Sequence, residues 1–263
     1  MPGCKNVLAG LACLFLFVGC MESEMPETSE FTVTDEKALG LAINNYILAD
    51  SLSFSALDQQ EFAAVQNYLN QRINFIGGVP TIDQTTFDWE VNVINDTTSI
   101  HAFTLPGGYI FVTQGLLEAL ESDAQLLGIL AFQVVLADQG FALDRLQEAY
   151  GFGLLLDVAL GRNSDVIEEL VTILYSQPMD QLMTQVVEDR SIRLICPTEF
   201  EANGLAEMLS NLQDTRESLT EWERIYPGNG ERVVRLNQFW EAEQCDGDLS
   251  GLESYSDFKA LLP

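Results

Sequence analysis

Residues 125–137, QLLGILAFQVVLA, constrain the fold of this 263-residue chain more than any other segment, because they are apolar almost all round. A helix on the surface of a protein carries a polar face, so a helix without one has to lie at the centre of a domain. Ser122 and Gln125 have the spacing of a capping box, which marks the start of a helix. The sequence therefore predicts a central buried helix that other elements surround.

The elements predicted around this helix are mostly helical as well. Apolar residues recur at helical spacing in five further segments: 35–76, 142–160, 164–175, 179–195 and 203–213. Three short segments are predicted as strands: 88–94, 99–104 and 109–113. One cluster of strands among many helices indicates an α+β domain, mainly helical, with a small β-sheet.

The charge balance excludes one class of partner. The chain has 40 acidic against 12 basic residues, for a formal net charge of -28. Such a surface repels the phosphates of nucleic acids, so we expect no nucleic-acid binding. Two interpretations stay open, an acidic face for a basic partner or divalent cations and a solvated surface suited to a saline habitat.

The stretch from residue 101 to 135, HAFTLPGGYIFVTQGLLEALESDAQLLGILAFQVV, resembles peptidase family M48, the HExxH zinc metallopeptidases that include CaaX-processing proteases and many envelope lipoproteins. The Pro106-Gly107-Gly108 turn and Ala131 fall at the family's positions. Two weaker blocks agree: DEKALG at 35–40, and IYPGNGERVVRL at 225–236, where Tyr226 stands at a histidine position. The resemblance spans roughly residues 35–240 and implies a zincin-like metallopeptidase scaffold.

The family's metal site requires two histidines one helical turn apart, a glutamate between them as base, and a glutamate ligand from a second helix. By the resemblance, the HExxH positions hold Phe132-Gln133-Val134-Val135-Leu136, and the ligand on the second helix is Gln185. Phenyl and isobutyl groups have no lone pair for a metal, and an amide is no useful base at neutral pH. We therefore expect neither zinc, the cofactor of active members, nor catalysis. Asp189, which the resemblance also retains, is predicted to form a salt bridge.

His101 is the only histidine in the chain, so no shift of the alignment can produce a site with two histidines. A ligand or general-base role is conceivable for it, but we favour a polar residue at a strand edge. The sequence contains no G-x-S-x-G motif, and no other histidine is present to serve as the base of a serine hydrolase.

The strand that leads into the Pro-Gly-Gly turn borders the substrate cleft of the family. A peptide can pair with such an edge by β-augmentation. The predicted peptide-binding edge therefore comprises Ile100, His101, Ala102, Phe103 and Thr104.

The N-terminus resembles the signal sequence of a bacterial lipoprotein. Lys5 precedes an apolar run from Val7 to Val18, and Phe17-Val18-Gly19-Cys20 resembles a lipobox, in which the cysteine receives the lipid anchor. A plain signal peptide or an uncleaved anchor is the alternative, and each version implies export to the bacterial cell envelope. Cys196 and Cys245 are then the only thiols left in the mature chain, so a disulfide between them is a possibility.

These observations predict four regions: a signal peptide at 1–19, an acidic flexible tether at 20–34, a metallopeptidase-like domain at 35–245 and a C-terminal tail at 246–263. The leading functional hypothesis is a pseudopeptidase lipoprotein that binds a protein or peptide partner in the envelope. The alternatives are a structural lipoprotein with a filled cleft and a residual enzyme, which would be either a metalloendopeptidase with unusual ligands or a hydrolase that acts by another route.

Overall fold

The computed structural model of the chain describes residues 31–50, 54–79, 82, 87–213, 222–228 and 231–263. Residues 31–263 belong to one compact unit. The predicted signal peptide, Cys20 and most of the predicted tether lie outside the described residues.

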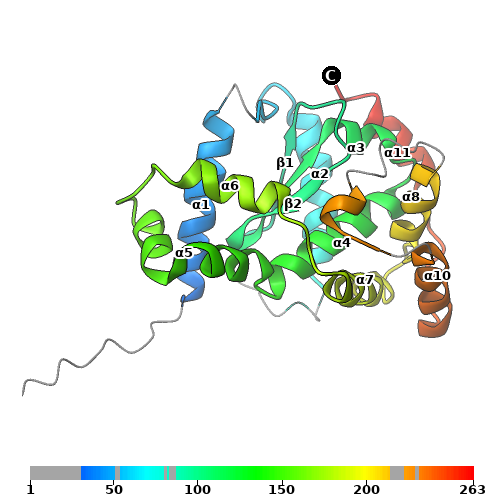
Figure 1. Cartoon of the computed structure of the whole chain (residues 1–263). Coiled ribbons are helices and arrows are strands. Elements are labelled where there is room, and N and C mark those ends of the chain that lie inside the picture. Colours follow the sequence, from blue (N-terminus) through cyan, green and yellow to red (C-terminus); the bar gives the residue numbers. More distant parts are fainter. Residues whose placement is uncertain (1–30, 51–53, 80–81, 83–86, 214–221, 229–230) are drawn as a thin grey trace, which may run out of the picture. The chain divides into compact units, whose positions relative to one another are not determined.

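The described elements confirm a mainly helical α+β fold (Figure 1). The helices are α1 (Val33–Ala49), α2 (Ala63–Gly77), α3 (Gln114–Ala119), α4 (Asp123–Asp138), α5 (Phe141–Ala159), α6 (Ile167–Ser176), α7 (Gln181–Ile195), α8 (Gly204–Gln213), α10 (Arg232–Glu243) and α11 (Leu252–Lys259). The strands are β1 (Glu90–Ile94), β2 (Ala102–Thr104) and β3 (Tyr109–Thr113), and a 3-10 turn, η1 (Pro106–Gly108), joins β2 to β3.

The three strands form one sheet in the order β1-β3-β2. β1 and β3 are parallel and β2 is antiparallel to β3, with Phe103 opposite Phe111. Alternate residues of a strand point to opposite faces, so each strand contributes to two hydrophobic clusters. Ile110 and Val112 belong to the cluster that includes α2, α4, α7 and α8, whereas Phe111 belongs to the cluster of α1, α5 and α6.

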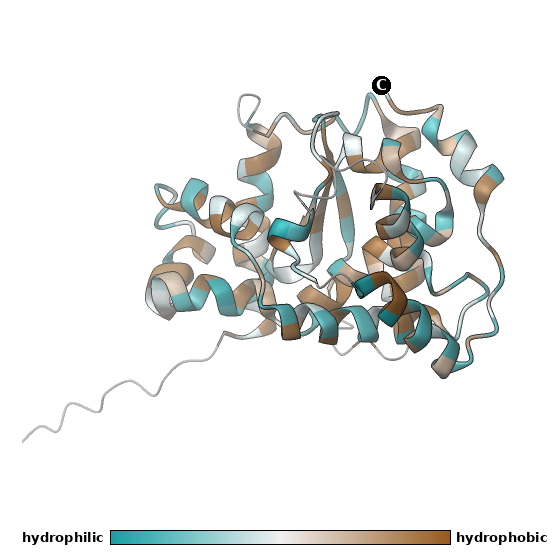
Figure 2. Cartoon of the chain, turned by 45° about the vertical axis from the view of Figure 1, so that its right-hand side comes forward, coloured by the Kyte–Doolittle hydropathy of each residue, from teal (hydrophilic) through white to brown (hydrophobic). Residues whose placement is uncertain are grey.

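The helices on both sides of the sheet show the pattern expected for this arrangement. Figure 2 shows hydrophobic and hydrophilic residues along most helices, in keeping with helices that turn one side toward a core. α4 is the exception, because all of its residues from Asp123 to Asp138 are buried. The central buried helix predicted from residues 125–137 is therefore present.

The start of α4 differs in one detail from the predicted capping box. The Ser122 hydroxyl accepts a hydrogen bond from the Gln125 backbone N–H at 3.2 Å, as expected. The Gln125 side chain, however, accepts from the N–H of Glu121 at 2.9 Å rather than from Ser122. The helix start was predicted correctly, but only half of the reciprocal box forms.

The Pro-Gly-Gly turn is held against α1 by close backbone contact. Gly107 and Gly108 adopt φ of 79° and 97°, values that favour glycine. A Cβ atom on Gly40 of α1 would lie 1.8 Å from the carbonyl oxygen of Pro106. The DEKALG block and the turn therefore belong together, because α1 can approach the turn this closely only through a glycine.

Two predicted region boundaries differ from the structure. Helix α1 begins within the segment predicted as a tether, because the Thr32 side chain caps it by accepting from the Asp35 N–H. Residues 246–263, predicted as a tail, contain α11, whose Tyr255 and Phe258 are buried in the larger core cluster. This helix was not predicted because it is short and buries only these two side chains, so its sequence shows no long periodic pattern.

None of the described helices is, by itself, both long enough and apolar enough to span a membrane. α4 and α5 meet both requirements as a pair, by length and composition only, with a bend of 48° at the break between them.

Candidate functional site

The helix α4 carries the predicted metal positions into the middle of the domain. Phe132 and Gln133 are completely buried, and 6% of the surface of Leu136 is exposed. All three positions lie on a helix that packs against β2, α5 and α7. The polypeptide thus presents these side chains at the place where the resemblance puts a catalytic centre.

Phe132 belongs to an aromatic cluster that fills this place. Its ring lies 4.9 Å from the ring of Tyr226 and 5.9 Å from that of Trp222, measured between centroids. Trp222 and Tyr226 in turn lie 4.8 Å apart. Side chains of this size, all buried, occupy volume that a metal ion with its ligands would need.

A short hydrogen-bonded chain joins Gln133 to the sheet. The Tyr226 hydroxyl donates to the carbonyl oxygen of Ala102 at 2.8 Å, and the Gln133 side-chain amide donates at 3.3 Å both to that carbonyl and to the tyrosine oxygen. Burial raises the pKa of Tyr226 to about 12, so its hydroxyl keeps the proton at neutral pH. A carboxylate at position 133 would instead bring negative charge against the Ala102 carbonyl.

The second helix contributes an ion-pair network beside the predicted ligand position. Asp189 pairs with Arg235, which agrees with the salt bridge expected for it. Glu188 is completely buried and pairs with both Arg232 and Arg235, two residues of α10. Gln185, the predicted ligand position, lies half-buried on α7.

Glu188 was not among the predicted site residues. The signal that was available is its place beside Asp189, together with Arg232, which the resemblance retains in the late block. Arg232 also donates to the backbone carbonyl of Tyr226 at 2.7 Å. The network therefore fixes the segment that carries Tyr226 as well as joining α7 to α10.

These residues do not fit the zinc ion that the resemblance implies. Phe132 and Leu136 offer no donor atom, and the Gln133 amide already donates to the Ala102 carbonyl. Within the part of the chain that the structure describes, no group of three His, Cys, Asp or Glu side chains could hold a metal ion. The side chains at these positions lack the donor atoms that a zinc site of this family requires.

His101 is enclosed by aromatic rings on the other side of the sheet edge. Its ring centroid lies 4.5 Å from that of Tyr175 and 5.8 Å from that of Phe103. Burial lowers the pKa of His101 to about 4, with a smaller contribution from the positive charge of Arg224. The imidazole is thus a buried, neutral group that packs among aromatic rings, directly before the edge strand β2.

The predicted peptide-binding edge is partly closed. β2 lies at an edge of the sheet, but it begins at Ala102, so Ile100 and His101 precede it. All five predicted residues, from Ile100 to Thr104, are buried. At Ala102 the carbonyl that a peptide would use accepts from the chain's own Tyr226, and Thr104 lies where the edge reaches a cavity.

That cavity has a volume of about 360 Å³ and lies directly beside the filled metal positions. Leu136 and Tyr226 line it, together with residues of α5, the loop 177–180 and α7, with Thr104 of β2 and with Leu174 of α6. The loop is fixed to the Tyr226 segment, because the N–H of Met179 donates to the carbonyl of Ile225 at 2.7 Å. A space of this size is enough for one or two side chains of a ligand.

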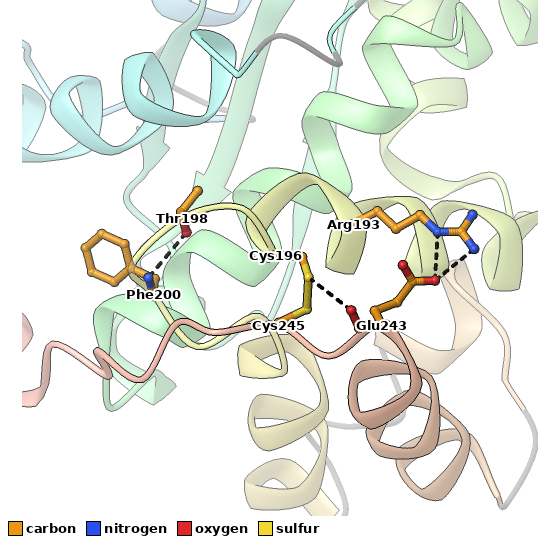
Figure 3. The surroundings of a disulfide bond; sticks show 6 residues. All are labelled: Arg193, Cys196, Thr198, Phe200, Glu243 and Cys245. Carbon is orange, nitrogen blue, oxygen red and sulfur yellow. Dashed lines mark hydrogen bonds and ion pairs between the residues drawn. A yellow bond between two sulfur atoms is a disulfide. The ribbon is translucent and has the colours of Figure 1, made fainter.

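Cys196 and Cys245 form a disulfide, with a distance of 2.09 Å between the sulfur atoms. Figure 3 shows it at the end of α7, beside the ion pair between Arg193 and Glu243. The disulfide joins α7 to the segment after α10, so it reinforces the same pair of helices as the buried ion pairs. It lies apart from the cavity, which neither cysteine lines.

Comparison with known proteins agrees with the resemblance drawn from the motifs. The sequence model of peptidase family M48 matches residues 59–133, which include the Pro-Gly-Gly turn and most of α4 before it ends at Gln133. The chain is 25% identical over 235 residues to the mitochondrial metalloendopeptidase OMA1 of Saccharomyces cerevisiae. That alignment covers 83% of this chain and 63% of the yeast protein, so the chain spans less than two thirds of its relative's length.

Proposed function

Since the chain belongs to peptidase family M48, we propose that it is a non-catalytic member, an exported lipoprotein that binds a protein or peptide partner beside its altered metal site. The observation that carries this proposal is the hydrogen-bonded contact of Gln133 and Tyr226 with Ala102. Gln133, at the position of the family's catalytic base, is therefore a buried packing residue. Its partner Ala102 belongs to β2, the edge strand beside the altered metal site.

The substitutions support one another, which argues against a single accidental loss. Phe132 packs on Tyr226, Tyr226 bonds to Ala102, and Gln133 bonds to both Tyr226 and Ala102. The Tyr226 hydroxyl and the Gln133 amide nitrogen therefore have hydrogen-bond partners, whereas the Gln133 Oε1 and the Trp222 Nε1 atoms are buried without one among the described residues. Phe132 and Leu136 are apolar and bring no polar group that would need a partner.

Binding is favoured over a purely structural role because the cleft is only partly filled. The cavity of about 360 Å³ persists between Leu136, Tyr226 and the first turn of α7. A scaffold retained only for its shape would gain stability by filling such a space. The partner that we expect is a protein or peptide of the bacterial envelope, reached through the lipid anchor proposed at Cys20.

The first experiment measures metal and activity on the purified full chain. We expect less than about 0.1 equivalent of zinc by atomic emission and no cleavage of casein, with or without added zinc. An active relative with an intact HExxH motif, prepared in the same way, is the control. If the protein holds one equivalent of zinc tightly and cleaves casein until a chelator is added, it is a metalloendopeptidase and the proposal is wrong.

The second experiment tests the anchor. Labelled palmitate supplied to cells that express the chain should enter the wild type and not the Cys20→Ala variant, which should leave the membrane fraction. The Cys4→Ala variant is the matched control and should label as the wild type does. Equal labelling of the wild type and Cys20→Ala would exclude lipidation at this cysteine.

A further inference from the structure

The cavity beside the altered metal site combines an apolar interior with a negatively charged rim. Its interior is formed mainly by apolar side chains: Leu136, Phe141, Leu174, Pro178, Met179 and Met183. Methionine side chains are flexible and polarisable, and they adapt to ligands of different shape. The interior is therefore suited to an apolar side chain rather than to a sugar or a nucleotide.

An apolar strip on α7 continues outward from this cavity. Leu182 is 71% exposed, Val186 is 49% exposed, and Met183, which lines the cavity, is 37% exposed. Residues three and four positions apart lie on the same side of a helix, so Val186 adjoins both Leu182 and Met183. The strip lies next to Gln185, and it extends the apolar surface along the former metal cleft.

Carboxylates also line the cavity. Asp144 and Glu148 are exposed on α5, one turn apart, and Asp180 lines it at the start of α7, where its side chain accepts from the N–H groups of Leu182 and Met183. Arg145, the single basic side chain in the lining, donates to the backbone carbonyl of Gln177 at 3.1 Å. The rim is therefore net negative and attracts a cation placed beside the apolar interior.

We propose that the cavity and the strip bind an extended peptide segment in which an apolar side chain stands next to lysine or arginine. The inference rests on the proposed function and specifies the class of partner. The apolar side chain enters between Leu136 and Met183, and the basic groups lie near Asp144 and Glu148. Thr104, at the free edge of β2, lines the same cavity and lies beside the bound backbone.

The charge of the whole chain argues for this occupant over an anionic lipid surface. A net charge of -28 repels anionic headgroups and favours association with basic segments. Two carboxylates with the spacing of Asp144 and Glu148 on their own would be an ordinary solvated face. Their position in the lining of a mainly apolar cavity, which Asp180 also lines, distinguishes the pair from such a face.

The test uses the purified full chain and fluorescent nine-residue peptides measured by anisotropy. The first peptide alternates lysine and leucine, the second replaces each lysine with glutamate, and the third replaces each leucine with serine. We expect the first to bind at least ten-fold more tightly than either of the others, with an affinity that falls as salt rises. Equal binding of the lysine and glutamate peptides would overturn the proposal.

Matched variants locate the site. Asp144→Asn with Glu148→Gln, and separately Met183→Ser, should each weaken binding of the first peptide at least five-fold. Their controls are Glu241→Gln with Asp257→Asn, and Val234→Ser, which remove exposed groups of the same kind from α10 and α11 and should leave binding unchanged. If the controls weaken binding as much as the cavity variants do, the peptide binds elsewhere and the proposal fails.

The same samples separate this inference from the proposed function. Mass spectrometry of the peptides after incubation shows whether any was cut. Cleavage would overturn the non-catalytic assignment, whereas the predicted preference among the peptides would still support the binding site. Intact peptides without any preference would leave the non-catalytic assignment standing and would overturn the site.

Discussion

In the proposed non-catalytic protein, Tyr226 closes the altered metal site, because its hydroxyl donates to the Ala102 carbonyl at the edge of the sheet. In the Tyr226→Phe variant, the Ala102 carbonyl keeps only its 3.3 Å contact with Gln133. We expect the free energy of unfolding to fall by about 1–2 kcal/mol, since a buried acceptor loses its better partner. Urea denaturation measures this loss. The control is Tyr150→Phe, whose hydroxyl bonds to the exposed side chain of Glu169 and whose removal should cost less than about 0.5 kcal/mol.

His101 should make the stability of the fold depend on pH, and NMR of its imidazole can follow the protonation directly. Burial lowers its pKa in the folded state from 6.5 to about 4, so below pH 6.5 the unfolded state takes up a proton that the folded state refuses. Stability should therefore fall as the pH drops from 6.5 to 4, by about 3 kcal/mol more in the wild type than in His101→Phe. As His101 is the only histidine, its imidazole resonances are assigned without ambiguity. A titration midpoint near 6.5 in the folded protein would contradict the buried position.

For single residues, the sequence could show which metal-donor atoms are absent but not which contacts the substituted side chains make. Phe132 and Leu136 already exclude metal ligation by their chemistry. The bonds from Gln133 and Tyr226 to Ala102 join residues 31 and 124 positions apart, and no local pattern reports such a pairing. Glu188 was missed for the same reason, because its partners lie on a different helix.

Between elements, α7 and α10 are held together by buried charge. In Arg232→Met, Glu188 remains buried with only Arg235 to compensate it. We expect a loss of about 3 kcal/mol in the free energy of unfolding, because a buried carboxylate is then only partly neutralised. Arg193→Met, which removes an ion pair exposed to solvent, is the control and should cost no more than about 1 kcal/mol. If the two variants lost the same free energy of unfolding, the buried ion pair of Arg232 with Glu188 would contribute no more to stability than the exposed pair of Arg193 with Glu243.

The disulfide should reinforce the same two helices. It closes a separation of 49 residues, for which the chain-entropy relation gives a stabilisation of about 4 kcal/mol as an upper figure. We expect dithiothreitol to lower the midpoint of thermal unfolding in the wild type. The Cys196→Ser, Cys245→Ser variant should unfold at the lower midpoint from the start and should not respond to the reductant. A wild type that is indifferent to reductant while the disulfide is shown to be open would contradict this stabilising role.

The elements themselves were largely predictable, because each is marked by a local period. The helices α4, α5 and α7 and the strands β1 and β3 begin and end within a few residues of the predicted segments. Helix α10 was not predicted, and the segment 35–76, predicted as helical throughout, contains two separate helices, α1 and α2. The other exceptions are elements with little local signal. α11 buries only Tyr255 and Phe258, and β2 pairs with β3 over only the three residues from Ala102 to Thr104.

For the molecule as a whole, the proposed function implies that the fold is retained without the family's chemistry. The Pro-Gly-Gly turn still packs on Gly40, and α4 still packs on α7, although the side chains between those helices no longer suit a metal. The scaffold depends on backbone contacts and on burial, which tolerate Phe132 and Leu136 as well as they tolerate histidines. A restored donor set should therefore find the helices already in place.

The variant Phe132→His, Leu136→His, Gln185→Glu tests this separation. The resemblance places residue 185 of α7 opposite positions 132 and 136 of α4, and the two helices pack together, so we expect zinc to bind in one equivalent and to raise the midpoint of thermal unfolding of the variant. Casein should remain intact, because Gln133 cannot serve as a base and its amide is held by the Ala102 carbonyl. The same variant with Gln185 unchanged is the control and should bind zinc at least ten-fold more weakly. If both variants bind zinc equally, α7 does not present residue 185 to α4, and the inferred geometry of the former site is wrong.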